Sequence, residues 1–183
     1  MRLPVIALLA CLLPLPAAGE VKDSQPDGFT LENSAWVPAP ADLAWDALVN
    51  HVGRWWPASH TWWGDPGKLS IEARAGGCFC ERAGDRQARH LEVVFVDPGK
   101  TLRLAGGLGP LQGMGLDGIL EFRLAPADEG GTLVTLWYRA GGYSPDDLSA
   151  FAPVVDRVQA QQLDGLVQFI KARHPGTDAE QGD

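Results

Sequence analysis

The sequence contains few cysteines, and their spacing does not favour a disulfide. Only three occur in 183 residues, Cys11, Cys78 and Cys80. Residues two apart on a regular strand are separated by roughly 6.5–7 Å, which is at or beyond the usual Cα separation in a disulfide. The sequence therefore predicts that Cys78 and Cys80 are free thiols and that no disulfide framework supports the fold.

Positive charge is also scarce and is not clustered. Lysine and arginine total 15 against 23 aspartates and glutamates, so the formal net charge is −8 at pH 7. Nucleic acids and anionic membrane surfaces attract clusters of basic residues. We therefore expect neither nucleic acid nor an anionic membrane surface as a partner. The oligomeric state does not follow from the composition.

Long apolar runs are absent except at the start of the chain. This run covers residues 3–15, follows Arg2 and precedes small residues at 17–19, which is the order typical of a secretory signal. It is shorter than the roughly 20 residues of a membrane-spanning helix. We expect a signal peptide over residues 1–19 and an exported, periplasmic protein with no transmembrane segment. Lipoprotein processing with a lipid anchor at Cys11 is the alternative.

The rest of the chain divides into one domain with short flanking segments. Residues 20–28 are polar and rich in turn formers, so we expect a flexible leader there. Residues 175–183 form an acidic tail that we expect to be disordered. A single folded domain is predicted between them, over residues 29–174, and its length is sufficient for a stable core.

Hydrophobic periodicity within the domain changes from strand to helix and back. Alternation over residues 29–37 predicts a strand, and helical spacing follows over residues 41–55. Alternation then returns in six segments joined by short turns, which predicts an antiparallel meander. These segments are residues 69–73, 78–82, 88–96, 101–108, 114–124 and 133–140. An apolar stripe from about residue 152 to residue 173 predicts a long helix.

This order of elements predicts an α+β fold. A curved antiparallel sheet cannot bury its concave face alone, so a long amphipathic helix is its natural cover. The expected architecture is a helix-grip fold, in which an N-terminal strand plus a six-strand meander wraps on the long C-terminal helix.

Several short motifs add a family resemblance to this prediction. The chain resembles the START-like, or SRPBCC, helix-grip superfamily, and within it the bacterial polyketide-cyclase-like branch related to the heat-shock ATPase-activator homology domain. The resemblance spans about residues 29–173 and is carried by Trp55-Trp56-Pro57, Gly76 to Glu81, Leu102-Arg103-Leu104, and Tyr143 with Pro145. It implies a cavity between the sheet and the C-terminal helix that holds an apolar small molecule, and it implies no particular reaction.

An aromatic segment over residues 51–67, HVGRWWPASHTWWGDPG, contains four of the seven tryptophans and two of the four histidines. Two interpretations remain open: the indoles anchor a loop to the core, or one or two of them line the mouth of a pocket. We expect Trp55 and either Trp62 or Trp63 to anchor the loop. His60 is the residue of this segment that is a candidate for chemistry.

The residues expected to line the cavity come from alternating strand positions, the helix stripe and the aromatic segment. Arg103 is included although an outward, solvated position is favoured by alternation; turned inward, it would pair with Glu81, Glu92 or a ligand carboxylate. The complete set is Trp56, His60, Trp63, Arg103, Leu116, Leu120, Phe122, Leu136, Tyr138, Val158 and Leu166.

Three residues are candidates for catalysis: His60, His90 and Cys80. A thiolate beside an imidazole could act as a nucleophile, and the same groups could hold zinc. Both arrangements depend on a strand register that the sequence does not give, and C-x-C departs from the usual zinc spacing. Buried, inert thiols are therefore favoured, and no metal site is expected.

The sequence thus favours an exported protein that binds an apolar or amphipathic small molecule without a cofactor. One alternative is a cyclase- or hydrolase-like enzyme that uses His60 or His90 as a base. Another is a protein-interaction module of the co-chaperone kind. Export weakens the last alternative because a cytosolic chaperone partner would be absent.

Overall fold

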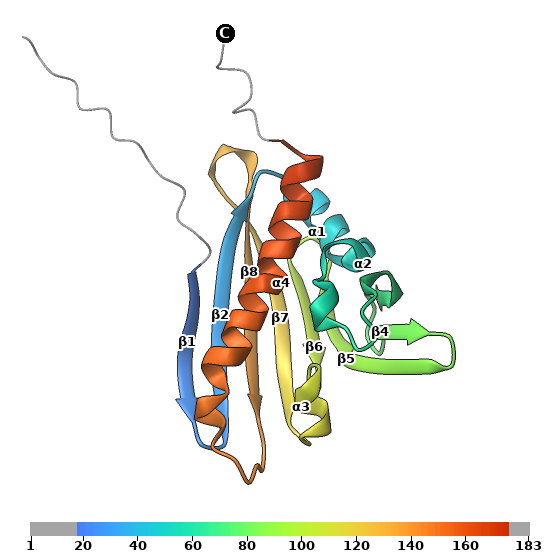
Figure 1. Ribbon diagram of the computed structural model, residues 1–183. Helices are drawn as coiled ribbons and strands as arrows, with labels where there is room; N and C mark the ends of the chain where they lie inside the picture. Colours follow the sequence, from blue (N-terminus) through green and yellow to red (C-terminus); the bar gives the residue numbers. More distant parts are fainter. Residues whose placement is uncertain (1–17, 176–183) are drawn as a thin grey trace, which may run out of the picture.

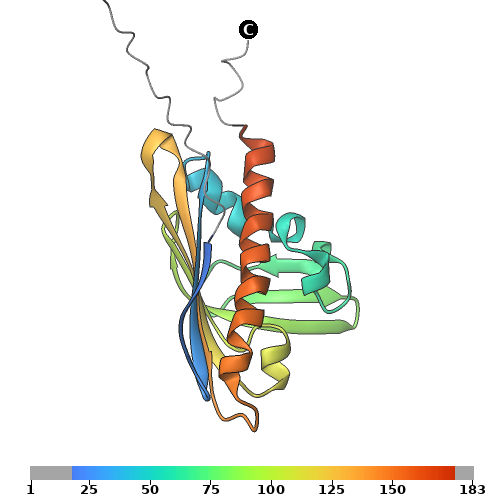
Figure 2. The ribbon, with the colours of Figure 1, turned by 60° about the vertical axis from the view of Figure 1, so that its left-hand side comes forward.

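The computed structural model describes residues 18–175 and shows an open antiparallel sheet with a long helix across one face (Figures 1 and 2). Within these residues the sheet has eight strands in the spatial order β1-β2-β8-β7-β6-β5-β4-β3. Their bounds are β1 (Ala18–Gln25), β2 (Gly28–Val37), β3 (Leu69–Ile71), β4 (Cys78–Ala83), β5 (Arg86–Asp97), β6 (Thr101–Ala105), β7 (Asp117–Pro126) and β8 (Thr132–Gly141). The predicted α+β helix-grip architecture is confirmed.

The helices are short except for the one at the C-terminal end. Pro153 lies in the first turn of this long helix, where its missing N–H costs nothing. The α-helices are α1 (Ala41–Asn50), α2 (Val52–Trp55), α3 (Pro110–Gly113) and α4 (Ala152–Arg173). Four 3₁₀ turns occur in the described chain: η1 (Ala58–His60), η2 (Pro66–Lys68), η3 (Asp128–Gly130) and η4 (Leu148–Ala150). None of the helices within residues 18–175 is long and apolar enough to cross a membrane.

The predicted six-strand meander is present as β3 to β8, each strand pairing with the next in antiparallel register. One of its strands begins later than expected. Residues 110–113 form α3, and β7 starts only at Asp117, because Pro110 favours a helical first turn over an extended strand. β2 pairs with β8 and thereby joins the N-terminal strand to the meander.

The N-terminal edge of the sheet differs from the prediction. Residues 20–25, expected to be a flexible leader, belong to β1, which pairs with β2 from Ala18↔Ser34 to Gln25↔Gly28. The Pro26-Asp27 turn makes this hairpin possible, and pairing satisfies the backbone groups at the edge of β2. The expected signal peptide lies mostly in residues 1–17, and the expected acidic tail lies mostly in residues 176–183, both outside the described residues.

The prediction of free thiols is wrong, because Cys78 and Cys80 form a disulfide. The register between β4 and β5 shifts between Phe79 and Cys80, which marks a β-bulge. The extra residue of this bulge is His90 on β5. The Cα atoms of Cys78 and Cys80 lie 5.4 Å apart, within the range that a disulfide spans, so β4 is less extended here than the regular strand that the prediction assumed. With its sulfur in this bond, Cys80 has no thiolate and does not serve as a nucleophile.

The core lies between the concave face of the sheet and α4. On the sheet, large apolar side chains alternate inward along β2, β7 and β8, and the C-terminal part of α4 packs on them. Core members with at most 2% exposure include Leu31, Leu120, Phe122, Leu136, Leu163, Leu166 and Ile170. Burial of each such side chain contributes about 1.5–3 kcal/mol, which fixes α4 against the sheet.

Candidate functional site

A pocket of about 390 Å³ lies beside the N-terminal half of α4. Its opposite walls are α3, with the loop before it, and the segment around η1; Figures 1 and 2 show both next to this part of the helix. The apolar lining residues are Trp56, Trp62, Leu108, Pro110, Leu111, Met114, Tyr138, Phe151, Val154, Val155 and Val158. The volume falls within the range of about 300–1,000 Å³ typical of small-molecule sites.

The pocket has a rim and a buried end. Trp62 and Val154 are 48% and 54% exposed and therefore lie at the rim. Trp56 and Tyr138 are 5% and 0% exposed and lie at the buried end. A ligand would therefore pass exposed apolar side chains at the rim before it reached the buried end.

The first two tryptophans hold the aromatic segment through their indole N–H groups. Trp55 is buried, and its Nε1 donates to the carbonyl of Ala47, 3.0 Å away, which links α2 to α1. Trp56 is also buried, and its Nε1 donates to the carbonyl of His60 at 3.0 Å. Trp55 is therefore an anchor, as predicted, and Trp56 both holds η1 and forms part of the pocket wall.

Neither the side chain of Trp62 nor that of Trp63 anchors the loop, so the prediction of a second tryptophan anchor is wrong. Trp62 is about half exposed at the rim, and the guanidinium of Arg86 stacks on Trp63 5.4 Å from the ring centre. The backbone of this segment is held instead. The fully buried carboxylate of Glu81 accepts hydrogen bonds from the N–H groups of Trp62 at 2.9 Å and Trp63 at 3.1 Å.

Glu81 also contacts His90, so the loop and the pocket share one carboxylate. His90 Nε2 lies 3.2 Å from Glu81 Oε2, and because a carboxylate only accepts, this nitrogen is the donor. His90 is 5% exposed and lines the pocket. Burial lowers the pKa of His90, with opposing contributions from Glu81, so the ring is neutral at pH 7 and Nδ1 has a free lone pair.

Several buried polar atoms of the lining lack hydrogen-bond partners within residues 18–175. They are Nδ1 of His60, both amide atoms of Gln159 and Oε1 of Gln162. The glutamines are 0% and 3% exposed and stand three residues apart on one face of α4. An unpaired buried polar atom costs about 1–3 kcal/mol, so these atoms favour a ligand that pairs with them.

Tyr138 adds a donor to this group. Its hydroxyl accepts a hydrogen bond from the N–H of Leu108 at 3.3 Å, which leaves its own proton available. Burial raises the pKa of Tyr138 to about 12. The hydroxyl therefore remains protonated and uncharged under physiological conditions.

The structure brings together only part of the predicted cavity lining. Trp56, His60, Tyr138 and Val158 line the pocket, and so does His90. A second group is buried in the core and is not part of the pocket lining: Leu116, Leu120, Phe122, Leu136 and Leu166. Trp63 lies outside the pocket, where Arg86 covers it.

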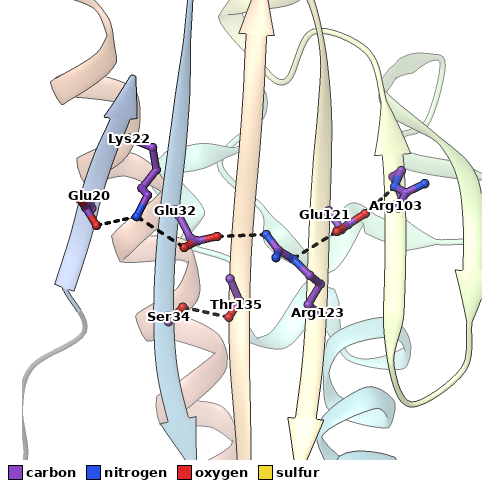
Figure 3. Close-up of polar contacts among 8 residues, drawn as sticks. All are labelled: Glu20, Lys22, Glu32, Ser34, Arg103, Glu121, Arg123 and Thr135. Carbon is purple, nitrogen blue, oxygen red and sulfur yellow. Dashed lines mark hydrogen bonds and ion pairs between the residues drawn. The ribbon is translucent and has the colours of Figure 1, made fainter. Parts of the chain in front are cut away.

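Arg103 lies on the outer face of the sheet, so an inward position beside Glu81 or Glu92 is wrong. It is paired with Glu121 across the register of β6 and β7, and its guanidinium lies 5.1 Å from the ring centre of Phe95. Figure 3 shows that this pair begins a row of ion pairs across the outer face. The row continues from Glu121 through Arg123, Glu32 and Lys22 to Glu20.

The lining residues that sequence reasoning missed are mainly in α3 and α4. Leu111 lies between two predicted strands and Met114 begins the second of them. The Gly109-Pro110 pair, which starts α3, is the sequence signal that could have indicated a helical turn here. Gln162 lies within the apolar stripe of the long helix. A polar residue at such a core-facing position is the sequence signal that could have indicated a buried amide in the lining. Within residues 18–175, no group of three or more His, Cys, Asp or Glu side chains is arranged to hold a metal ion.

Comparison with known proteins agrees with this architecture. CalU16 from Micromonospora echinospora has 18% identity and a TM-score of 0.56, over 85% of this chain and 88% of that chain. An uncharacterised protein from Rhizobium leguminosarum has 18% identity and a TM-score of 0.57, over 85% and 97%. The protein MLL2253 from Mesorhizobium loti has 19% identity and a TM-score of 0.55, over 78% and 97%.

These low identities show a shared fold and carry no information on ligand or reaction. A search of curated protein sequences gives no match. One family model, described as polyketide cyclase/dehydrase and lipid transport, matches residues 29–170. That span includes β2 to β8 and most of α4, and on this match the chain belongs to the polyketide cyclase/dehydrase and lipid transport family, within the SRPBCC superfamily.

Proposed function

We propose that this protein binds an apolar or amphipathic small molecule in the pocket beside α4. The observation that carries the proposal is the combination of an apolar lining with unpaired, buried polar atoms at Gln159, Gln162 and His60. An empty apolar pocket loses packing contacts, and an unpaired amide loses hydrogen bonds. A molecule with an apolar body and a polar group would restore both, and the family description, which includes lipid transport and cyclases, is compatible with such a ligand.

We also propose that the protein acts after export. The apolar run at residues 3–15 followed by small residues supports a secretory signal. The Cys78–Cys80 disulfide supports an oxidising compartment, since disulfides are rare in the cytosol. Expression of the full chain in a Gram-negative bacterium tests this by fractionation and intact mass. A periplasmic product that begins at Glu20 is expected; a lipid-modified product beginning at Cys11 would support the anchored form, and an uncleaved cytosolic product would contradict export.

Binding is tested with N-phenyl-1-naphthylamine, an uncharged probe whose fluorescence rises in apolar surroundings. The purified protein is expected to bind one probe per chain. Val158→Phe places a larger side chain in the pocket and is expected to weaken binding at least ~10-fold, because the probe and the new ring compete for the same space.

Val94→Phe is the matched control for this experiment. Val94 is 43% exposed on β5, outside the pocket, so the same substitution there is expected to leave probe affinity unchanged. Absence of probe binding to the unmodified protein would overturn the proposed function. Unchanged binding in Val158→Phe would show that the probe binds elsewhere, and equal weakening by both substitutions would show that the effect is not specific to the pocket.

A second candidate function is acid–base catalysis on the bound molecule, and the Glu81–His90 pair is the observation that favours it. The carboxylate fixes the imidazole tautomer and would stabilise the imidazolium formed when Nδ1 accepts a proton. Hydrogen–deuterium exchange at the methyl group of 2-acetylnaphthalene in D₂O provides a test. The protein is expected to accelerate exchange and His90→Gln to remove the acceleration; exchange at the buffer rate would reject this candidate.

A further inference from the structure

We propose that the pocket selects an uncharged ligand that carries a hydroxyl or primary amide group, bound at Gln159. This inference rests on the proposed small-molecule function and specifies the chemical class of the ligand. It follows from two properties of the lining: the absence of a charged partner for an ionic ligand, and the presence of both a free donor and a free acceptor at one buried side chain.

The first property is the charge of the pocket. Among the described residues, no Asp, Glu, Lys or Arg contributes to its lining. Burial lowers the pKa values of His60 and His90 and raises that of Tyr138 to about 12, so all three side chains are neutral at pH 7. A carboxylate or ammonium group would be buried here without a counter-charge, which is strongly unfavourable.

Glu81, the carboxylate behind His90, does not change this conclusion. Both of its oxygens already accept hydrogen bonds, from the N–H groups of Trp62 and Trp63 and from His90. Its side chain is fully buried and does not line the pocket. A ligand cation therefore has no access to it, and a ligand anion would be repelled.

The second property is the hydrogen-bonding capacity of Gln159. Its Nε2 and Oε1 are both buried and unpaired within the described chain, so a donor and an acceptor are available whichever way the amide is turned. A hydroxyl or primary amide both donates and accepts, and it can satisfy the two atoms together. An ether or a ketone only accepts, so it would leave Oε1 unpaired.

The neighbouring groups extend this recognition site. Oε1 of Gln162 provides a further acceptor one helical turn away on α4, and Tyr138 retains a proton to donate. Ser59, Thr61, His60 and His90 add uncharged polar groups, and the other lining side chains are apolar, among them Trp56, Met114 and Val155. The site therefore fits a ligand with one neutral polar end and an apolar body.

Three naphthalene derivatives of similar shape test the inference by displacement of N-phenyl-1-naphthylamine at pH 7. 2-Naphthol donates and accepts, 2-methoxynaphthalene only accepts, and 2-naphthoate is anionic. 2-Naphthol is expected to displace the probe at a concentration about 10-fold lower than 2-methoxynaphthalene, and 2-naphthoate to be the weakest. Equal displacement by naphthol and methoxynaphthalene, or the strongest displacement by naphthoate, would overturn the inference.

The role of Gln159 is tested with Gln159→Leu and a matched control, Gln168→Leu. Gln168 is exposed on the same helix, outside the pocket. Gln159→Leu is expected to abolish the preference for 2-naphthol while improving binding of 2-methoxynaphthalene, and Gln168→Leu to change neither. An unchanged preference in Gln159→Leu would reject that residue as the recognition group.

The experiment also separates this inference from the function on which it rests. If the probe binds but the three competitors do not differ, small-molecule binding stands and selection of a neutral donor–acceptor group fails. If the probe does not bind to the unmodified protein, the proposed function fails, and the inference fails with it. The competitor series uses the unmodified protein, so it gives an answer even if Gln159→Leu does not fold.

Discussion

The two halves of α4 pack in different ways against the rest of the molecule. In the sealed half, residues 163–173, the side chains of Leu163, Leu166 and Ile170 are fully buried against the sheet. In the pocket half, residues 152–162, Val155 and Val158 face a space of about 390 Å³. One helix thus combines a close-packed segment that fixes the fold with a segment that leaves room for a ligand.

The difference arises from what stands opposite each half. The sealed half lies against Trp55: a Cβ added at Gly165 would lie 2.3 Å from the carbonyl oxygen of Trp55. The ring of Trp55 in turn packs edge-on against Phe122 of β7, with ring centres 6.5 Å apart. Opposite the pocket half stand α3 and η1. These are short, irregular segments: η1 is held by the hydrogen bond from Trp56 to the carbonyl of His60, and the loop before α3 by the bond from the N–H of Leu108 to Tyr138. Each has only one buried anchor on the core, Trp56 beside η1 and Leu111 in α3.

The largest expected difference is in the stability lost when a leucine is replaced by alanine in the close-packed core and in the pocket lining. Leu136→Ala, in the close-packed core, removes a side chain that is 1% exposed and leaves a cavity, so it is expected to lower the free energy of unfolding by about 2–5 kcal/mol. Leu111 is 6% exposed and borders a space that already exists, so Leu111→Ala is expected to fall at the low end of that range, because fewer contacts are lost. Urea denaturation of both variants measures the difference.

Binding of N-phenyl-1-naphthylamine to the same two variants completes the comparison. Leu111→Ala is expected to alter the affinity for the probe, since Leu111 lines the pocket, and Leu136→Ala to leave the affinity of the folded protein unchanged. Equal losses of stability, with equal effects on binding, would show that the two halves do not differ in packing.

Glu81→Gln is expected to have a smaller effect on stability. The substitution keeps the shape of the side chain and removes one of the acceptors that support the pocket wall. The amide NH₂ cannot accept, so one of the hydrogen bonds from Trp62, Trp63 and His90 is lost in a buried position. The expected cost is about 1–3 kcal/mol in the free energy of unfolding. Probe dissociation is also expected to be faster, as measured by stopped-flow fluorescence, because the loop with Trp62 is less firmly held.

Glu92→Gln is the control for this substitution. Glu92 lies on β5, and its side chain is 45% exposed and paired with Arg89, so its loss is expected to change stability by less than about 1 kcal/mol. Probe dissociation from this variant should match the unmodified protein. A similar dissociation rate in Glu81→Gln would show that the carboxylate does not hold the pocket wall.

The sheet and the long helix could be predicted from the sequence because each has a regular period. Alternation in residues 133–140 and the stripe of α4 correspond to β8 and the core-facing side of the helix. The position of the pocket along α4 could not be predicted, because Leu136 and Val158 are equally apolar and periodicity does not show what lies opposite them. This is why five predicted lining residues belong to the close-packed core.

Other errors arose where the chain departs from regular geometry. The Cα atoms of Cys78 and Cys80 lie 5.4 Å apart, beside a β-bulge at His90 of the neighbouring strand, and a two-residue period indicates neither the shorter spacing nor the bulge. Glu81 was considered only as a partner of Arg103, because the hydrogen bonds from the backbone of Trp62 and Trp63 depend on a loop conformation that has no sequence period. The functional wall of the pocket is built mainly from such irregular segments.

The smallest expected effect is a difference in pH dependence between the two halves. The pocket wall contains His60 and His90, whose pKa values burial lowers from the usual 6.5. The unfolded chain therefore binds more protons than the folded one as the pH falls below about 6.5, so stability is lost on acidification. Urea midpoints at pH about 7.5 and about 5.5 measure this loss.

The double variant His60→Gln/His90→Gln is expected to lose less stability over that interval than the unmodified protein, while His174→Gln, at the end of α4 beyond the sealed half, is expected to lose as much. The amide introduced by His90→Gln would still donate a hydrogen bond to Glu81, so the loop support is kept and the titrating imidazole is removed. Parallel pH dependence in all three proteins would mean that the histidines of the pocket are not the groups that couple protonation to folding.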